Sequence, residues 1–425
     1  MSSKPKALFD AILGKYHPFN KVWIGLSGGL DSVVLLHIAI HSSLLKAQAV
    51  KPRAIHVHHG LSPNADAWAG HCQKLCVKAG IPYIQSAITT EPCPGESIEA
   101  WAREVRRRCF LNVMQPGDLL LTAQHQDDQA ETVLLQLLRG AGVKGLSAMP
   151  EASVFGPGKM LRPLLGMTRA DIQAYAEQYE LSWVEDESNR NMKFDRNFLR
   201  HEIMPRISAR WPASNVVLAR AAENAADISE VLQRYLDSLL PTVISTKGQL
   251  AIPALTALAS AEQRLLLQAW LQQQGAGHVS RAQLQQILDE VIAAKPEAEP
   301  CYYLKPFSVR RYADRLYVVP EQSVISENYC QSWDGAQPLL IPGWGRLDKT
   351  TLAAQGLAVE ALDWANVSVR FRQGGERCRP KGRRHSQYLK KLFQEYHVEP
   401  WLRDRLPLLY CDNKLVMVVG GWVCE

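Results

Sequence analysis

Several features that mark other classes of protein are missing from this sequence of 425 residues. It has no run of about 18 apolar residues, the length that crosses a bilayer, and its first ten residues, MSSKPKALFD, lack the apolar segment of a secretion signal. Its nine cysteines include no CxxC pair. We therefore expect a cytoplasmic protein with no membrane partner, and buried free thiols in place of a zinc site or a disulfide framework.

Most of the chain also lacks a net charge. Residues 1–365 hold 36 Lys and Arg against 36 Asp and Glu, whereas Asn366 to Glu425 hold 12 against 6. The net charge of +6 therefore lies entirely in the last 60 residues. A local basic face of this kind is the electrostatic footprint of a nucleic-acid partner.

The stretch Val22 to Ser32, VWIGLSGGLDS, predicts a nucleotide site. An apolar run of strand length leads into Ser27-Gly28-Gly29 and then into a helix. Backbone N–H groups at such a helix start bind phosphate, and glycine lets the backbone approach it closely. Asp31 suits a Mg²⁺ ligand or a helix cap better than a phosphate ligand. The lysine signature of ordinary P-loop enzymes does not occur, which disfavours transfer of a γ-phosphate.

Strand and helix patterns alternate along the first half of the chain. Strands are expected at 22–26, 53–60, 83–88 and 119–123, and helices at 6–16, 32–40, 64–78, 98–110, 127–138 and 168–179. This alternation predicts an α/β fold with a doubly wound parallel sheet over residues 1–212. We expect a mainly helical domain at 213–320, with a hairpin near 308–319, and a small α+β domain at 338–425.

Acidic and basic side chains recur at helical spacing after the predicted strands. Asp127 and Glu131 share a helix face with Asp128 beside them, and adjacent acids near a nucleotide site favour coordination of Mg²⁺ and pyrophosphate. Acids in a first helical turn are also explained by the helix dipole alone. Arg196 and Arg200 are spaced to grip phosphates from one helix face, although a solvated charged helix has the same pattern.

Three histidines follow the second predicted strand, at the edge where open α/β sheets bind ligands. His56 and His58 alternate on one strand face, and His59 points elsewhere. A three-histidine metal site would need an unusual turn, so we favour a wall of the active site, with a surface turn as the alternative.

The basic region near the C-terminus combines positive charge with aromatic residues. Arg370 to His385 holds eight basic residues, counting the histidine, and one acid, and Lys390-Lys391 follow on a predicted helix. Its aromatic residues could stack on unpaired bases but are more simply the core of a small domain. We expect this region to contact an RNA backbone.

These motifs together resemble a known family. SGGLDS at 27–32 is similar to the pyrophosphate loop of the N-type ATP pyrophosphatases, whose signature is SGGxDS and which cleave ATP between the α and β phosphates. Nearly end to end, the chain resembles the tRNA(Ile)-lysidine synthetases. The resemblance rests on HVHHGLS at 56–62, AQHQDDQAET at 123–132, RPLL at 162–165, EDESN at 185–189, RNFLRHEIMP at 196–205, VRFRQGGERCRPKG at 369–382, LKKLFQE at 389–395 and PWLRDRLPLLY at 400–410. Glu399 stands where a second proline is common in that family.

The resemblance implies a reaction and its partners. ATP with Mg²⁺ would adenylate the 2-carbonyl oxygen of the wobble cytidine in the isoleucine tRNA that carries a CAU anticodon, releasing pyrophosphate. The ε-amine of free L-lysine would then displace AMP and give lysidine, which changes decoding from AUG to AUA. Because the pKa of that amine is roughly 10.4, a base or a desolvating pocket is needed. A homodimer is left open.

We assign residue roles as hypotheses. ATP binding is assigned to Ser27, Gly28, Gly29, Leu30, Asp31, Ser32, His58 and His59. Catalysis is assigned to Asp31, Asp127, Asp128, Glu131, Arg103, Arg196 and Arg200, with Mg²⁺ on Asp31, Asp127 and Asp128. The ammonium group of lysine is an alternative ligand for one carboxylate among Asp127, Asp128 and Glu131. Binding of tRNA is assigned to Arg377, Arg379, Lys381, Arg383, Arg384, Lys390 and Lys391.

Three other functions compete with this one. A tRNA thiolase would share the loop but needs paired cysteines for sulfur, and none is paired here. An amidating ligase of small molecules would release AMP without tRNA and leaves the basic tail unexplained. A non-catalytic RNA-binding protein would bind tRNA without consuming ATP, which the intact Ser27, Asp31 and acidic pair argue against.

Overall fold

A six-stranded sheet organises the first half of the chain in the computed structural model. The structure describes residues 3–58, 60, 62–88, 90, 95, 98–187, 191–277, 279–295, 298–321, 325–326 and 328–425. These form two compact units, 1–233 and 234–425. The predicted domain limits at 212, 320 and 338 stay predictions.

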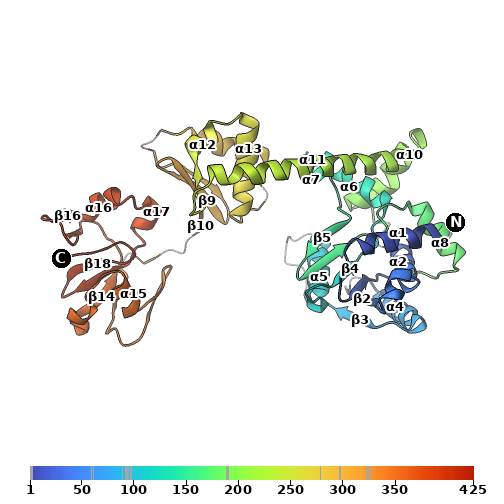
Figure 1. Ribbon diagram of the computed structural model, residues 1–425, viewed down its shortest axis with the longest axis horizontal. Coiled ribbons are helices and arrows are strands. Elements are labelled where there is room, and N and C mark those ends of the chain that lie inside the picture. Colours follow the sequence, from blue (N-terminus) through green and yellow to red (C-terminus); the bar gives the residue numbers. More distant parts are fainter. Residues whose placement is uncertain are drawn as a thin grey trace. The chain divides into compact units, whose positions relative to one another are not determined.

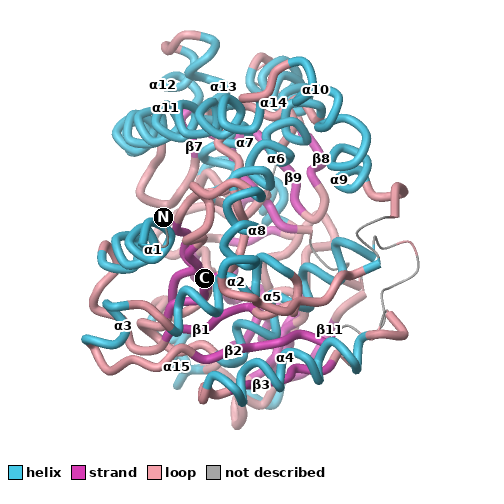
Figure 2. Tube along the Cα trace, turned by 90° about the vertical axis from the view of Figure 1, so that its right-hand side faces the viewer, coloured by secondary structure: helices cyan, strands magenta, loops and turns pink. Residues whose placement is uncertain are grey.

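The sheet of the first unit has the order β3-β2-β1-β4-β6-β5. Its strands are β1 (Val22–Gly25), β2 (Arg53–His58), β3 (Tyr83–Ala87), β4 (Leu119–Leu121), β5 (Ala152–Phe155) and β6 (Gly158–Leu161). All neighbours are parallel except β5, which pairs antiparallel with β6 at the edge. Figure 2 shows β1, β2 and β3 side by side. The predicted doubly wound α/β sheet is confirmed, and the β5–β6 hairpin is an addition to it.

Helices cover both faces of this sheet because successive strand residues point to opposite sides. Ile24 packs in one core with α1, α2, α4 and α8, whereas Trp23 packs in a second core with α5. The helices of this unit are α1 (Ser3–Gly14), α2 (Leu30–Ile40), α3 (Ser43–Ala47), α4 (Ala65–Ala79), α5 (Ile98–Val113), α6 (Gln126–Leu138), α7 (Val143–Leu146) and α8 (Arg169–Gln178). The capping box expected at Thr168 and Asp171 is present at the start of α8.

One segment, Leu30–Ala47, is long enough and apolar enough to cross a membrane, judged by its length and composition alone. It consists of α2 and α3, and 56% of it is buried inside the unit. Leu30, Val34, Leu35 and Ile38 of α2 belong to the first core. The apolar composition of this segment is therefore explained by packing beneath the sheet.

A run of helices leaves the sheet after residue 194. It comprises α9 (Asp195–Phe198), a π-helical turn (Leu199–Ile203), α10 (Met204–Arg210) and the 30-residue α11 (Ser214–Val243). Figure 1 draws α11 in yellow-green as one continuous helix. Because residues 233 and 234 divide the two units, α11 is the covalent link between them.

The second unit begins with helices around a small antiparallel sheet. The helices are α12 (Ile252–Thr256), α13 (Ser260–Gln273), α14 (Arg281–Gln286) and a π-helical turn (Ile287–Ile292). The strands, in the order β7-β10-β9-β8, are β7 (Leu250–Ala251), β8 (Cys301–Leu304), β9 (Phe307–Tyr312) and β10 (Arg315–Pro320). The predicted hairpin is β9–β10, confirmed with Ala313 in the left-handed conformation its turn requires.

The remainder of the second unit is a mixture of short strands and helices. Its main sheet has the order β11-β14-β17-β18-β19, built from β11 (Cys330–Ser332), β14 (Val367–Arg370), β17 (Leu408–Cys411), β18 (Lys414–Val418) and β19 (Trp422–Val423). Two hairpins, β12 (Leu339–Ile341) with β13 (Gly345–Leu347) and β15 (Arg377–Cys378) with β16 (Gln387–Tyr388), flank it. The helices are α15 (Lys349–Ala354), α16 (Leu389–Glu395) and α17 (Pro400–Arg403), with single 3₁₀ turns at Val359–Ala361 and Trp364–Asn366. The α+β character expected for this region is confirmed.

Candidate functional site

The loop between β1 and α2 presents backbone N–H groups that small side chains organise. The Ser32 hydroxyl accepts from the N–H of Ser27 (3.2 Å) and of Gly28 (3.1 Å) and donates to the carbonyl of Gly29 (2.9 Å). The Ser27 hydroxyl accepts from the N–H of Gly29 (3.3 Å). The two hydroxyls thus occupy N–H groups beside a helix N-terminus, and a phosphate oxygen that binds there would replace them as the acceptor.

Glycine is required at one position of this loop. Gly28 has φ +89°, in the left-handed region. A Cβ there would lie 3.0 Å from Val184 Cγ2 and 3.1 Å from the Cys72 sulfur. Any side chain at Gly28 would therefore be strained by its backbone and crowded by its neighbours.

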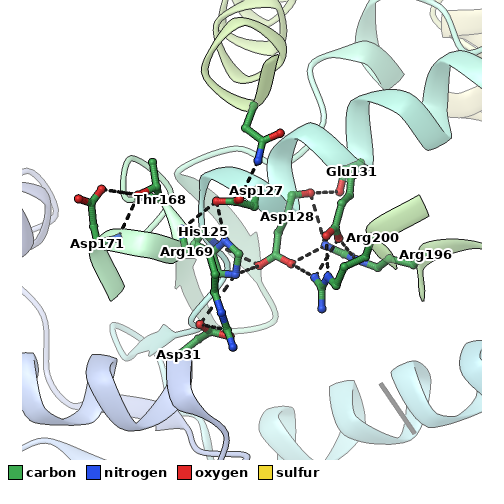
Figure 3. A network of polar contacts seen from close by, with 12 residues as sticks. Asp31, His125, Asp127, Asp128, Glu131, Thr168, Arg169, Asp171, Arg196 and Arg200 are labelled. Atoms are coloured by element: carbon green, nitrogen blue, oxygen red, sulfur yellow. Dashed lines mark hydrogen bonds and ion pairs between the residues drawn. The ribbon is translucent and has the colours of Figure 1, made fainter. Parts of the chain in front are cut away.

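Asp31 and Asp127 belong to one polar network that joins the loop to α6 and α8 (Figure 3). Asp31 pairs with the guanidinium of Arg169 and lies 3.8 Å from His125 Nε2. Asp127 accepts hydrogen bonds from the backbone N–H of Arg169 (2.8 Å) and from Asn215 Nδ2 (2.7 Å). The network thus brings together the predicted residues Asp31 and Asp127, and adds Arg169 and Asn215, which the sequence did not single out.

A second part of the network holds two guanidinium groups against two carboxylates. Arg200 donates to Glu131 Oε1 (2.6 Å), and Arg196 donates to Glu131 Oε2 (2.8 Å). Both arginines also donate to Asp128 Oδ1, at 2.9 Å from Arg196 and 2.8 Å from Arg200. Figure 3 shows the arginines converging on Glu131 and Asp128 from one side. The i,i+4 pair is therefore not a solvated helix face, because Glu131 and Asp128 hold both guanidinium groups, and its contact with phosphate stays a prediction.

The charges in this network shift the pKa values of its members. Burial alone would raise the pKa of Asp127, but His125 and hydrogen bonds from Arg169 and Asn215 lower it to about 2. Burial would lower the pKa of His125, yet the carboxylates of Asp127, Asp128 and Asp31 raise it above its usual value. The carboxylates of Asp127 and Asp128, whose pKa values are lowered, are therefore charged at neutral pH, and the buried imidazole is pushed towards its charged form.

The histidines after β2 are placed differently from one another. His56 is buried, and its Nδ1 lies 2.8 Å from the carbonyl of Leu26, behind the nucleotide loop. His58 pairs with Asp66 at the start of α4, with 3.0 Å between Nε2 and Oδ1. His59 lies outside the described residues. Neither described histidine contacts the acidic network, and their role in ATP binding stays a prediction.

Two other predicted residues lie apart from the network. The side chain of Leu30 is buried in the core, so only its backbone faces the loop. Arg103 lies on the exposed side of α5. Burial, and after it the charge of Arg103, lowers the pKa of Arg106 and of Arg162. Within the part of the chain that the structure describes, the polar partners of Asp31 and Asp127 do not include Arg103, and its catalytic role stays a prediction.

The basic residues assigned to tRNA binding lie on the β15–β16 hairpin, the connection within it and α16. We call them the tail cluster: Arg377, Arg379, Lys381, Arg383, Arg384, Lys390 and Lys391. Arg377 covers the ring of Tyr388 at 4.8 Å, and Arg383 is held by Glu395 at 2.6 Å. Tyr388, Lys390 and Lys391 line a cavity of about 550 Å³. An exposed aromatic ring beside exposed cations suits a nucleotide of an RNA chain.

The donor set near Asp31 fits magnesium only in part. Among the residues that the structure describes, no three acidic, histidine or cysteine side chains form a complete metal site. Asp31 and Asp127 keep their carboxylates about one-quarter exposed, whereas Asp128 shares one oxygen between two guanidinium groups. Since Mg²⁺ commonly takes one or two carboxylates and completes its shell with water and phosphate oxygens, Asp31 and Asp127 suit it and Asp128 does not.

Comparison with known proteins matches three parts of the chain to family models. Residues 1–207 match the family model of the PP-loop domain, 250–317 match the TilS substrate binding domain, and 367–425 match the TilS substrate C-terminal domain. The tRNA(Ile)-lysidine synthase of Coxiella burnetii is 41% identical over 406 residues, covering 95% of this chain and 89% of that protein. The tRNA(Ile)-lysidine synthase of Methylococcus capsulatus is 40% identical over 419 residues, covering 98% and 95%. With such identity over nearly its whole length, the chain belongs to the tRNA(Ile)-lysidine synthase family.

Proposed function

We propose that this chain uses ATP to join free L-lysine to C2 of the wobble cytidine in the isoleucine tRNA with a CAU anticodon. One observation carries the proposal. A single polar network links Asp31 of the nucleotide loop to the paired arginines on the helix after residue 194, through His125 and Asp128. A site that binds pyrophosphate at one end and holds two fixed guanidinium groups at the other suits adenylate transfer.

The chemistry needs two displacements. In the first, the 2-carbonyl oxygen of cytidine forms a bond to the α-phosphorus of ATP while the bond from that phosphorus to the bridging oxygen breaks, and pyrophosphate leaves. In the second, the lysine ε-nitrogen forms a bond to C2, AMP leaves with the oxygen, and the amine proton passes to a base. Adenylation is required because the carbonyl oxygen is a poor leaving group until it becomes a phosphate ester.

Different residues bind the phosphates, stabilise the developing charge and position the arginines. The loop N–H groups of Ser27, Gly28 and Gly29 would hold the pyrophosphate portion, exchanging their present bonds to the Ser32 and Ser27 hydroxyls for phosphate oxygens. The fixed guanidinium groups of Arg196 and Arg200 stabilise the negative charge that develops at the α-phosphate. Asp128 and Glu131 act through these arginines by fixing their direction, and we therefore treat them as positioning residues.

Magnesium would be held by Asp31 and Asp127, whose carboxylates flank His125. When bound, the ion neutralises phosphate charge and so makes pyrophosphate a better leaving group. The carboxylate that receives the ammonium group of lysine stays a prediction. Glu131 is a poor candidate, because its side chain is 3% exposed and both its oxygens accept from arginine.

The tail cluster would bind the tRNA backbone. Its seven positive charges are mostly exposed, and the domain that carries them matches a substrate domain of the family. Cytoplasmic location and a homodimer stay predictions.

The test is AMP formation with matched tRNAs. The purified chain, ATP and lysine should release AMP with the CAU isoleucine tRNA and not with methionine tRNA. Arg200→Lys keeps the positive charge but loses the two-point contact with Glu131, and should lower the rate of AMP formation. Arg139→Lys, which alters an exposed ion pair with Asp195, is the control and should leave that rate unchanged. Release of AMP without tRNA would favour the amidating ligase and contradict the proposal.

A further inference from the structure

Arg169 links Asp31 and Asp127, the two predicted magnesium ligands whose surroundings suit the ion, although no sequence motif pointed to it. It is the first residue of α8, and its backbone N–H donates to Asp127 at 2.8 Å. Its guanidinium pairs with Oδ1 of Asp31 in the nucleotide loop. The two contacts are independent, because one uses the backbone and the other uses the end of the side chain.

The side-chain contact conflicts with a metal on Asp31. Oδ1 of Asp31 already pairs with the Arg169 guanidinium, and His125 Nε2 lies 3.8 Å from the same oxygen. A divalent ion on the same carboxylate would stand within a few ångströms of the guanidinium, and like charges at that distance repel strongly. Arg169 must therefore release Asp31, or share it weakly, when magnesium binds.

A second anion lies within reach when the guanidinium moves. Pyrophosphate held by the N–H groups of Ser27 to Gly29 would adjoin Asp31, two residues further along the same loop. The Arg169 side chain is 46% exposed, so it is free to change rotamer. Guanidinium groups bind phosphate oxygens in a two-point, charge-assisted geometry.

We propose that Arg169 is a phosphate-binding residue whose guanidinium exchanges its pairing with Asp31 for the pyrophosphate portion of ATP when magnesium and ATP bind. The inference rests on the proposed function. It gives Arg169 two opposite effects: the guanidinium competes with magnesium for Asp31 and contributes to the binding of pyrophosphate.

A purely structural ion pair is the alternative. α8 is already fixed at this end by the Thr168–Asp171 capping box and by the contact of its first N–H with Asp127, and neither contact involves the Arg169 side chain. Replacing that side chain should therefore leave the fold intact. A structural pair would also not predict effects of opposite sign on two ligands.

The experiment is calorimetric titration of the full chain with two probes, Mg²⁺ alone and pyrophosphate alone. Arg169→Met keeps the length of the side chain and the backbone contact to Asp127. It should bind Mg²⁺ about threefold more tightly, the scale of a half-exposed ion pair. It should bind pyrophosphate about tenfold more weakly, the scale of charge-assisted hydrogen bonds. Arg169→Lys should recover part of the pyrophosphate affinity.

Arg139→Met is the matched control, because Arg139 is also a surface arginine with one carboxylate partner, Asp195 at 3.8 Å. It should change neither affinity, and thermal melting should be the same for both methionine variants. Equal weakening of both probes in Arg169→Met, or unchanged pyrophosphate affinity, would overturn the inference. Failure of the unmodified chain to bind Mg²⁺ would contradict the proposed magnesium site instead, while the pyrophosphate titration would still decide the role of Arg169 at phosphate.

Discussion

Glu131→Gln tests whether a buried acid fixes Arg196 and Arg200, the two arginines that we propose act in catalysis. The Glu131 side chain is 3% exposed and accepts three hydrogen bonds, from Arg200 Nε (2.6 Å), Arg200 Nη2 (2.9 Å) and Arg196 Nε (2.8 Å). Glutamine has the same shape but no charge, and one of its two terminal atoms is a donor that faces guanidinium N–H groups. The substitution therefore removes the ion pairs without leaving a cavity.

The expected loss of stability follows from burial and from the partners that remain. Removing one partner of a fully buried ion pair costs about 3–5 kcal/mol. Here the arginine side chains are 33% and 36% exposed and both keep their bonds to Asp128, so water and that carboxylate offset part of the loss. We expect Glu131→Gln to lower the free energy of unfolding by about 2 kcal/mol, measured from urea unfolding at constant m.

Activity separates positioning from stability. With the arginines released, the rate of AMP formation should fall by about 100-fold, the scale of one preorganised electrostatic contact, while tRNA affinity is unchanged. Asp195→Asn, which breaks an exposed pair 3.8 Å long, is the control and should alter stability by less than about 0.5 kcal/mol. If Glu131→Gln is as stable and as active as that control, the acids do not fix the arginines and the reasoning fails.

Four further changes probe the rest of the site. Asp31→Ala should abolish AMP formation and leave tRNA affinity intact in filter binding; equal loss of both would refute its assignment to the nucleotide. Replacing the three lysines of the tail cluster with alanine should reduce the slope of log affinity against log salt by about two to three, and an unchanged slope would count against backbone contact. His125→Gln should destabilise the chain more at about pH 6 than at about pH 9 in urea unfolding. The raised pKa of the folded-state histidine stabilises the fold below its unfolded value of about 6.5, and this stability is lost as pH rises through the folded-state pKa. An equal difference at both pH values would contradict the charged imidazole. Asn215→Ala removes the 2.7 Å bond to Asp127 and should lower stability by about 1 kcal/mol while weakening Mg²⁺ binding in calorimetry, and full retention of both would show the contact to be incidental.

Features set by neighbouring residues could be predicted from the sequence. The β1–α2 loop follows from an apolar run next to Ser-Gly-Gly, and the start of α8 follows from Thr168 and Asp171 three residues apart. The β9–β10 hairpin follows from alternating residues on either side of a short polar turn. The parallel sheet follows from the alternation of such elements, because helical crossovers join parallel strands.

Contacts between distant residues could not be predicted in the same way. Arg169 contacts Asp31, 138 residues away in the sequence, and Asn215 contacts Asp127, 88 residues away. Neither Arg169 nor Asn215 belongs to a sequence motif that predicts which residue it will contact. The spacing of Arg196 and Arg200 predicted that they act together. That they would be held by Glu131 depends on how α6 packs near the helix after residue 194, which only the folded chain defines.

The most direct test of the central claim is transfer of labelled lysine in a single turnover. The chain is mixed with ATP, Mg²⁺, radiolabelled lysine and a transcript of the CAU isoleucine tRNA, with methionine tRNA as the control. We expect lysine to become stably attached to the isoleucine tRNA alone, with one AMP released for each lysine joined. Release of AMP without attachment of lysine, or attachment to both tRNAs alike, would contradict the proposed function.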